Sequence, residues 1–288
     1  QLMMKIMKKN IILIAAALVA LASCEKPAPY EPGAPMDVNG PNVYFSNYNL
    51  SAVTLASDAT EFEVAVIRDD ASSALSVPLK ADCGYEGLFE VPATVEFASG
   101  VDSVGVVVKI TDKFEMFKPY MLTLSVPEEY YHSYSAQEAY PNYTMNVLQE
   151  DYVPYKEGMY YDMFFTGAGW PVTLEYSEIQ KLYRLSDVWV PLGGSSEDLT
   201  FTWDGGESPL TMGAGSYQTG LTMGNYGLVT AVVTPNAEDD WYCWYGAIPA
   251  EELYEGSPAT QGFIFYFKWT VSAGSFGYYA QFFVPNAE

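Results

Sequence analysis

Residues 91–112 read Val-Pro-Ala-Thr-Val-Glu-Phe-Ala-Ser-Gly-Val-Asp-Ser-Val-Gly-Val-Val-Val-Lys-Ile-Thr-Asp. Apolar residues alternate in two runs, Val95 with Phe97 and then Val104 to Ile110, and a Ser-Gly pair separates the runs. Successive side chains of a β-strand point to opposite faces, so each run places one face on a core and the other in water. The stretch therefore predicts two strands of an antiparallel sheet.

The same alternation continues on both sides of this stretch. Short runs of period two, separated by Gly, Pro, Asp and Asn, predict several strands between residues 43 and 148, as is typical of an antiparallel β-sandwich. The further runs are Phe62/Val64/Val66, Leu75/Val77/Leu79, Leu122/Leu124/Val126 and Tyr143/Met145/Val147. We assign residues 42–149 to this module.

The order of these features resembles the second half of a Calx-β domain. An apolar-Phe strand, a Gly turn, a Val-rich strand, an Asp and a Leu-x-Leu strand follow one another in that order up to Leu124. Some members of that family bind calcium through clustered acids, and Asp112 and Glu115 fall near the matching stretch. Calcium takes six or more oxygen ligands, and Lys118 stands where a further acid is expected. We therefore expect a scaffold here and no metal site.

The composition changes after the polar residues 149–157. All six tryptophans lie beyond residue 150, and residues 150–288 predict an aromatic-rich second module that is a β-sandwich or β-barrel-like. Its runs are Val172/Leu174/Tyr176, Leu199/Phe201/Trp203, Leu228/Thr230/Val232, Phe263 to Val271 and Tyr278/Ala280/Phe282. Residues 177–185 and 250–254 could each form a short helix instead. In its texture, such as Glu-Gly-Met-Tyr-Tyr at 157–161, this half is similar to C-terminal modules of surface lipoproteins from Bacteroidota.

The N-terminus predicts a lipoprotein signal peptide over residues 1–23. A basic segment precedes an apolar run that is too short to span a bilayer as a helix. The sequence Leu21-Ala22-Ser23-Cys24 resembles the lipobox of bacterial lipoproteins, which implies cleavage before Cys24 and its modification by fatty acyl chains such as palmitate. A plain signal peptide with a coincidental Cys is the alternative. Residues 24–41 would then carry the lipid and form a proline-rich tether.

We expect an all-β chain of two antiparallel β-sandwich modules in tandem, held by its lipid to the bacterial outer membrane. Glu25 is followed at once by Lys26, which leaves open whether the protein faces the cell exterior or the periplasm. The chain has 36 acidic and 13 basic side chains, for a net charge of -23. Because phosphate recognition needs clustered Lys and Arg, this balance argues against a nucleic-acid partner.

The sequence offers little catalytic apparatus. The one histidine, His132, has no Gly-x-Ser-x-Gly partner motif, and Cys83 and Cys243 lie too far apart to suggest a zinc site or a disulfide. An acidic pair of the glycosidase type would arise by chance among so many acids. We therefore expect no catalytic residue, no cofactor and no metal, and treat an envelope hydrolase as a minor alternative.

The aromatic stretch at 238–246 is the strongest candidate for ligand binding. As an extended strand it would carry aromatic rings on both faces, so one face is either buried or presented to a ligand. Rings beside carboxylates suit a glycan. The candidate residues are Trp241, Tyr242, Trp244, Asp239 and Asp240, together with Trp170, whose Gly and Pro neighbours predict a loop. The main rival is a structural or adhesive envelope subunit that binds a protein partner.

Overall fold

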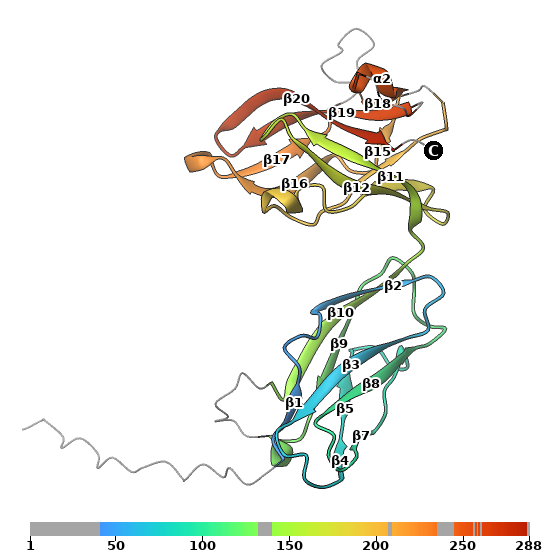
Figure 1. Ribbon diagram of the computed structural model, residues 1–288, viewed down its shortest axis with the longest axis vertical. Helices are drawn as coiled ribbons and strands as arrows, with labels where there is room; N and C mark the ends of the chain where they lie inside the picture. The colour runs from blue at the N-terminus through green and yellow to red at the C-terminus, as the bar shows by residue number, and fades with distance from the viewer. Residues whose placement is uncertain are drawn as a thin grey trace, which may run out of the picture.

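The computed structural model describes residues 41–131, 140–206, 209–234, 245–255, 257, 259 and 261–286. These residues form two lobes (Figure 1), each with its own hydrophobic core. The all-β prediction is confirmed, because the described helices are all short: η1 (Glu128–Tyr130), η2 (Val190–Leu192), η3 (Gly224–Tyr226) and α2 (Ala250–Leu253). None of them has the length and apolar character to cross a membrane. The predicted signal peptide, Cys24 and most of the tether lie outside the described residues.

Strands β1 to β10 form the N-terminal lobe. One four-stranded sheet has the order β1-β3-β8-β6, a second has the order β2-β10-β9-β5, and β4 pairs with β7. The strands are β1 (Val43–Phe45), β2 (Ala52–Ala56), β3 (Glu61–Arg68), β4 (Leu75–Pro78), β5 (Lys80–Asp82), β6 (Phe89–Glu90), β7 (Thr94–Phe97), β8 (Ser103–Ile110), β9 (Tyr120–Ser125) and β10 (Asn142–Glu150).

The core of this lobe follows the predicted alternation. In β3, Val64 and Val66 are buried while Ala65 between them is more exposed. In β8, the buried Val106 lies opposite Val64 and the buried Val108 lies opposite Phe62. Leu122 and Leu124 of β9 belong to the same buried cluster. The two sheets therefore enclose one core between them, as the sandwich prediction requires.

One strand pairing departs from the antiparallel prediction. Strand β2 runs parallel to β10, with Asn146 opposite Ala52 and Glu150 opposite Ala56. Beyond the ladder, Gln149 Nε2 donates to the carbonyl oxygens of Ala56, Ser57 and Ala59 at 3.0 to 3.2 Å. The beginning of the lobe is thus bonded to its last strand, a pairing that local sequence patterns do not reveal.

Strands β11 to β20 form a single ten-stranded sheet in the C-terminal lobe, with the order β15-β14-β13-β12-β11-β20-β19-β17-β16 and with β18 also paired to β19. The strands are β11 (Val153–Asp162), β12 (Gly169–Ser177), β13 (Leu182–Leu185), β14 (Leu199–Thr202), β15 (Thr211–Met212), β16 (Ser216–Thr222), β17 (Leu228–Val232), β18 (Tyr245–Pro249), β19 (Gln261–Val271) and β20 (Gly274–Pro285).

This sheet curls until distant segments meet. The backbone N–H of Leu210 donates to Tyr245 O at 2.8 Å, and that of Ser195 donates to Thr219 O at 2.7 Å. The aromatic core lies inside the curl, where Phe201, Phe265 and Phe267 are fully buried. Of the two architectures that the sequence left open for this module, the structure therefore shows a curled half-barrel.

The structure corrects three local predictions. Residues 182–185 form β13 and not a helix, whereas the expected helix at residues 250–254 is present as α2. In β17 the buried face carries Val229 and Ala231, and Leu228 is exposed. In β20 Gln281 and Phe283 face the core, and Val284 and Pro285 are buried at the end of the strand, so the predicted run of Tyr278, Ala280 and Phe282 faces outward. Both faces of these strands are apolar, and alternation alone could not tell the inner face from the outer one.

The two lobes are joined through Arg184 of β13. Its guanidinium lies 2.6 Å from Glu150, 2.8 Å from Glu175 and 3.1 Å from Asp198. It also lies 3.7 Å from the centroid of the Tyr152 ring. Glu150 ends the last strand of the N-terminal lobe. The guanidinium of Arg184 therefore bonds the end of that lobe to the C-terminal sheet.

Candidate functional site

The long hairpin of β19 and β20 presents an aromatic outer face. In β19, Phe263, Phe265, Phe267 and Trp269 point into the core, while the alternate residues are half-buried on the outside. Ile264 pairs with Phe282 and Tyr266 pairs with Ala280 across the ladder. The strand therefore carries large apolar side chains on both faces, although only the inner face is needed for the core.

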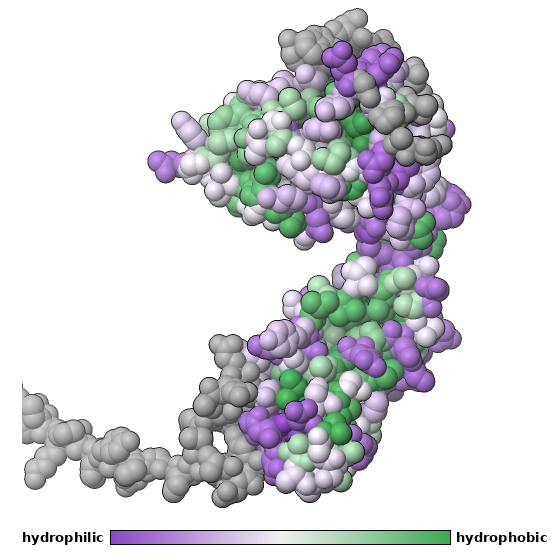
Figure 2. Space-filling model, viewed as in Figure 1, coloured by the Kyte–Doolittle hydropathy of each residue, from purple (hydrophilic) through white to green (hydrophobic). Residues whose placement is uncertain are grey.

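A groove of about 520 Å³ lies on this outer face. Its floor is formed by Ile264, Tyr266, Tyr278, Ala280 and Phe282 of the hairpin. Its walls are Glu252 and Leu253 of α2, Met163 after β11, and Tyr279. We call these nine residues the tyrosine groove. Figure 2 shows apolar side chains reaching the surface over the end of the lobe formed by β16, β17, β19 and β20.

A glycine sets the position of the α2 wall. A Cβ atom on Gly262 would lie 2.6 Å from Leu253 Cδ1 and 3.0 Å from Phe283 O. Both distances are shorter than ordinary van der Waals contact, so a side chain at residue 262 would displace the Leu253 side chain and press on the backbone of β20. The wall of the groove therefore depends on Gly262.

Three nearly parallel rings continue the groove along the α2 side. The rings of Tyr254 and Tyr161 are 5.6 Å apart between centroids, and those of Tyr161 and Phe282 are 4.9 Å apart, each pair inclined by 22°. Tyr254 is 52% exposed. Burial, and then the neighbouring Tyr254, raise the pKa of the Tyr161 hydroxyl. A tyrosine hydroxyl is protonated at neutral pH even at its ordinary pKa of about 10, so it can both donate and accept a hydrogen bond.

The opposite wall is held by a buried carboxylate. Asp162 is fully buried and accepts hydrogen bonds from the backbone N–H groups of Phe164, Phe165 and Thr166. Gln281 Nε2 donates to it as well, at 2.8 Å. These bonds fix the turn after β11, which carries Met163. Phe164 in the same turn stacks on Trp269 with 4.5 Å between ring centroids.

The structure places only one of the predicted binding residues. Trp170 lies in β12 and not on a loop. It is half-buried, its ring is 5.6 Å from that of Tyr160, and its indole nitrogen has no hydrogen-bond partner among the described atoms. It is not among the residues of the tyrosine groove, and a ligand contact of Trp170 stays a prediction. The other predicted residues, Trp241, Tyr242, Trp244, Asp239 and Asp240, lie outside the described residues, as do His132 and Cys243.

Of the two acids suggested by the Calx-β resemblance, Asp112 and Glu115, Glu115 is engaged with neighbouring side chains. Glu115 accepts hydrogen bonds from Lys118 Nζ at 2.6 Å and from the Tyr120 hydroxyl at 2.9 Å. The bond from Lys118 is the main cause that lowers the pKa of this carboxyl group. Across the described parts of the chain, no group of three or more His, Cys, Asp or Glu residues is placed to hold a metal ion.

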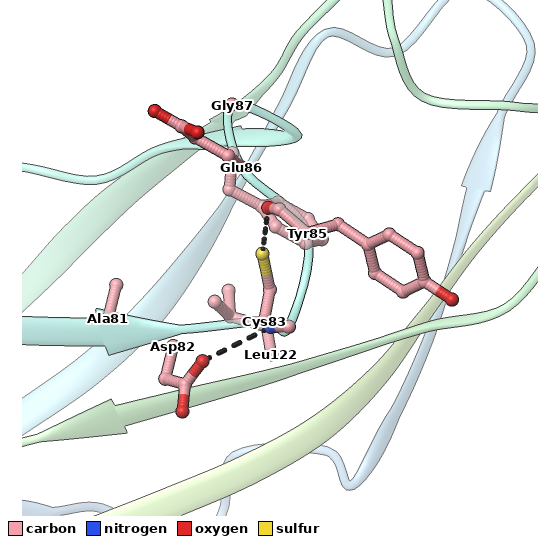
Figure 3. A pocket seen from close by; sticks show the side chains of 9 residues that line it. Ala81, Asp82, Cys83, Tyr85, Glu86, Gly87 and Leu122 are labelled. Atoms are coloured by element: carbon pink, nitrogen blue, oxygen red, sulfur yellow. Dashed lines mark hydrogen bonds between the residues drawn. The ribbon is translucent and has the colours of Figure 1, made fainter.

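A smaller hollow of about 360 Å³ lies at the loop between β5 and β6 of the N-terminal lobe (Figure 3). The thiol of Cys83 donates to Tyr85 O at 2.7 Å, and Asp82 accepts from the N–H of Gly84 at 3.1 Å. The Tyr85 ring, which also lines the hollow, extends away from the Cys83 and Asp82 side chains (Figure 3). The polar groups at this place thus stabilise their own loop, and the tyrosine groove is the better candidate for a ligand.

The sequence contained a signal for the groove that alternation concealed. Residues 261–271 carry aromatic rings at odd positions and also Ile264 and Tyr266 between them. A strand that is apolar on both faces must have its second face covered or presented. Residues 238–246 and β19 share this pattern of rings on both faces, whereas the contributions of Met163 and Leu253 depend on tertiary structure.

Comparison with known proteins gives fold likenesses only. No family model matches the chain and no curated protein matches it. Among solved structures, it is similar to an apo-form Calx CBD1 domain, with 21% identity and a TM-score of 0.27 over 38% of this chain and 97% of that one. It is also similar to a protein of unknown function from Bacteroides ovatus, with 7% identity and a TM-score of 0.33 over 84% of this chain and 89% of that one.

An auxiliary nutrient binding protein from Bacteroides thetaiotaomicron is a third match, with 9% identity and a TM-score of 0.32 over 82% of this chain and 89% of that one. All three TM-scores are below 0.5. We therefore infer the function from the geometry of this chain alone.

Proposed function

We propose that the protein is a non-catalytic glycan-binding protein of the bacterial cell envelope, and that the tyrosine groove is its binding site. The observation that carries this proposal is the outward-facing floor of Tyr266, Tyr278 and Phe282 beside the carboxylate of Glu252. Flat rings pack against the apolar C–H faces of sugars, while hydroxyl and carboxylate oxygens bond to sugar hydroxyls.

The exposure of the groove supports a ligand over simple packing. Met163 is 45% exposed and Tyr279 is 43% exposed, although the core of the lobe already buries a large set of aromatic rings. Large exposed apolar patches are uncommon on soluble proteins, and those that occur usually mark binding sites. Among the described lining residues, Glu252 is the one carboxylate, whereas glycosidases use a pair. Binding without turnover is therefore the function that this groove suits.

Affinity electrophoresis of the full chain in gels containing soluble starch, xylan, mannan, hydroxyethyl cellulose or pectin tests the proposal. We expect at least one polysaccharide to retard the protein. We expect Tyr266→Ala and Tyr278→Ala each to weaken the affinity about two- to tenfold, because each removes a ring-stacking contact worth about 0.5 to 1.5 kcal/mol. Tyr48→Ala is the matched control, since Tyr48 is 89% exposed in the N-terminal lobe.

Two outcomes contradict the proposal: no retardation by any polysaccharide, or retardation that both groove variants retain. Trp241→Ala and Trp244→Ala belong in the same series. If these two variants lose binding while Tyr266→Ala and Tyr278→Ala do not, the aromatic stretch at 238–246 is the site in place of the groove.

The envelope location is a separate part of the proposal and rests on the lipobox Leu21-Ala22-Ser23-Cys24. Expression in a bacterium fed labelled palmitate should label the wild-type chain, and Cys24→Ser should abolish both the label and its recovery in the membrane fraction. An unlabelled wild-type chain would refute the lipid anchor without affecting glycan binding.

A protein partner is the second candidate occupant of the groove. Met163, Leu253 and Ile264 give its lining an apolar share that protein interfaces also show. Light scattering of the purified chain distinguishes a protein partner from a glycan as the occupant of the groove. A stable oligomer that Leu253→Asp dissociates, without binding to any polysaccharide, would favour the structural or adhesive subunit.

A further inference from the structure

We propose that the tyrosine groove selects neutral or positively charged glycans and excludes polyanionic ones. This selectivity rests on the glycan binding proposed above. It follows from the positions of the charged side chains around the groove.

Acidic side chains dominate the α2 wall. Glu251 and Glu252 lie in α2, Glu255 follows it, and all three are exposed. Glu252 lines the groove itself. Leu253 packs against Gly262, which keeps the backbone of α2, and with it these carboxylates, next to the groove.

The floor offers little positive charge to offset them. Its side chains are apolar or phenolic, and a phenol with the ordinary tyrosine pKa of about 10 is neutral at neutral pH. Lys268, which pairs with Tyr278, is the basic side chain on the outer face of β19 and β20. The charges next to the groove are therefore one lysine, Lys268 beside Tyr278, and the three carboxylates of and after α2.

A carboxylated sugar bound in the groove would lie near these like charges. Charges within a Debye length, about 8 Å at physiological salt, interact without full screening. The net charge of the whole chain, -23, repels a polyanion before it arrives as well. Three exposed carboxylates together should lower the affinity for an anionic sugar about tenfold relative to a neutral one.

The test uses the neutral polysaccharide that retards the protein most, together with its carboxymethyl and diethylaminoethyl derivatives at equal substitution. At low salt we expect the carboxymethyl form to bind about tenfold more weakly than the parent and the diethylaminoethyl form to bind more tightly. The differences should shrink in about 0.5 M NaCl, where the Debye length falls to roughly 4 Å.

Two variants with equal net charge locate the effect. Glu251→Gln/Glu252→Gln/Glu255→Gln should reduce the discrimination, measured as the ratio of the affinities for the carboxymethyl and parent forms, about fivefold or more. Because Glu252 lines the groove, the affinity for the parent polysaccharide itself is expected to fall in this variant, and only the ratio is compared. Glu61→Gln/Glu90→Gln/Glu129→Gln neutralises three exposed acids of the N-terminal lobe and should preserve the discrimination.

Each other outcome overturns the inference. Equal binding of the parent and its two derivatives, or tighter binding of the carboxymethyl form or of pectin, refutes charge selection while glycan binding stands. Equal effects of the two triple variants would assign the discrimination to net charge and not to α2. If no polysaccharide binds, the proposed function fails and the selectivity fails with it.

Discussion

Arg184 Nη1 and Glu150 Oε2 form an ion pair of 2.6 Å between the sheet of the C-terminal lobe and the last strand of the N-terminal lobe. Both side chains are largely buried, with 12% and 14% of their side-chain surface exposed. Since Tyr152 lies under the same guanidinium, the short connector between the lobes is held on both sides. Arg184 thus forms ion pairs with both lobes, with Glu150 at the end of the N-terminal lobe and with Glu175 and Asp198 in the C-terminal lobe.

Replacing Arg184 should unfold the C-terminal lobe more easily. Arg184→Met leaves Glu150, Glu175 and Asp198 without their cation, and removing one partner of a largely buried ion pair costs about 3 kcal/mol. All six tryptophans lie beyond residue 150, so urea unfolding followed by tryptophan fluorescence reports on this half of the chain. Lys181→Met is the control, because its pair with Glu178 is exposed and should contribute less than about 1 kcal/mol. Equal unfolding midpoints for the two variants would disprove the assignment.

Asp198 should make stability depend on pH in a definite direction. Burial raises the pKa of this carboxyl group, although Arg184 opposes the shift. A raised pKa means that the folded state holds the proton more tightly, so the ionised carboxylate lowers stability at pH 7. That cost disappears as the pH falls through the raised pKa toward the unfolded value of about 3.9. Asp198→Asn should therefore be more stable than wild type in urea at pH 7 and equal to it near pH 3.5. A less stable variant at pH 7 would show that the pairing with Arg184 outweighs burial.

Gly262→Ala should displace the α2 wall. The new Cβ would approach Leu253 Cδ1 and Phe283 O, and overpacking of this kind costs about 1 to 3 kcal/mol. We expect lower stability and weaker retardation by the polysaccharide that binds the wild type. In Gly262→Ala/Leu253→Ala the truncated side chain makes room, so the double variant should lose less stability than the sum of the single variants. Gly206→Ala, whose Cβ would meet nothing closer than 3.5 Å, is the control. Strict additivity would exclude the contact with Leu253.

Asp162→Ala should loosen the Met163 wall and destabilise the lobe by about 3 kcal/mol or more, since several buried N–H donors lose their acceptor. Asp162→Asn should be nearly as harmful. Both carboxylate oxygens accept hydrogen bonds, and the asparagine NH2 group would replace one of these oxygens with a donor that faces other donors. Asp82→Ala removes an acceptor from an exposed turn and should cost less than 1 kcal/mol. Denaturant unfolding compares the three, and a stable Asp162→Asn would indicate that one acceptor oxygen suffices.

The sequence predicted strands well where one face is buried and the other is wet. Val64, Val66, Val106 and Val108 are buried at the predicted positions, because a half-buried strand leaves a clear period of two. The prediction of the inner face failed in β17 and β20, where both faces are apolar. The curl of the C-terminal sheet also escaped prediction, since it depends on contacts such as Leu210 with Tyr245.

The candidate site was less predictable than the fold. The tyrosine groove combines two strands of one hairpin with Met163 and Leu253, which are distant from each other in sequence. Its walls depend on Gly262 and on the bonds of Asp162, and neither residue type signals such a role before the tertiary structure is known. An excess of aromatic residues in the second half indicated the lobe that carries the groove but not the residues.

The parallel pairing of β2 with β10 has a consequence for biosynthesis. Gln149 bonds to the carbonyl oxygens of Ala56, Ser57 and Ala59 across about ninety residues of chain. Contacts between such distant residues form slowly and cannot form before both partners have been made. During synthesis or secretion, the first lobe must therefore remain incomplete until residue 150 has emerged, and β2 stays an unpaired strand open to chaperones or to aggregation throughout that time.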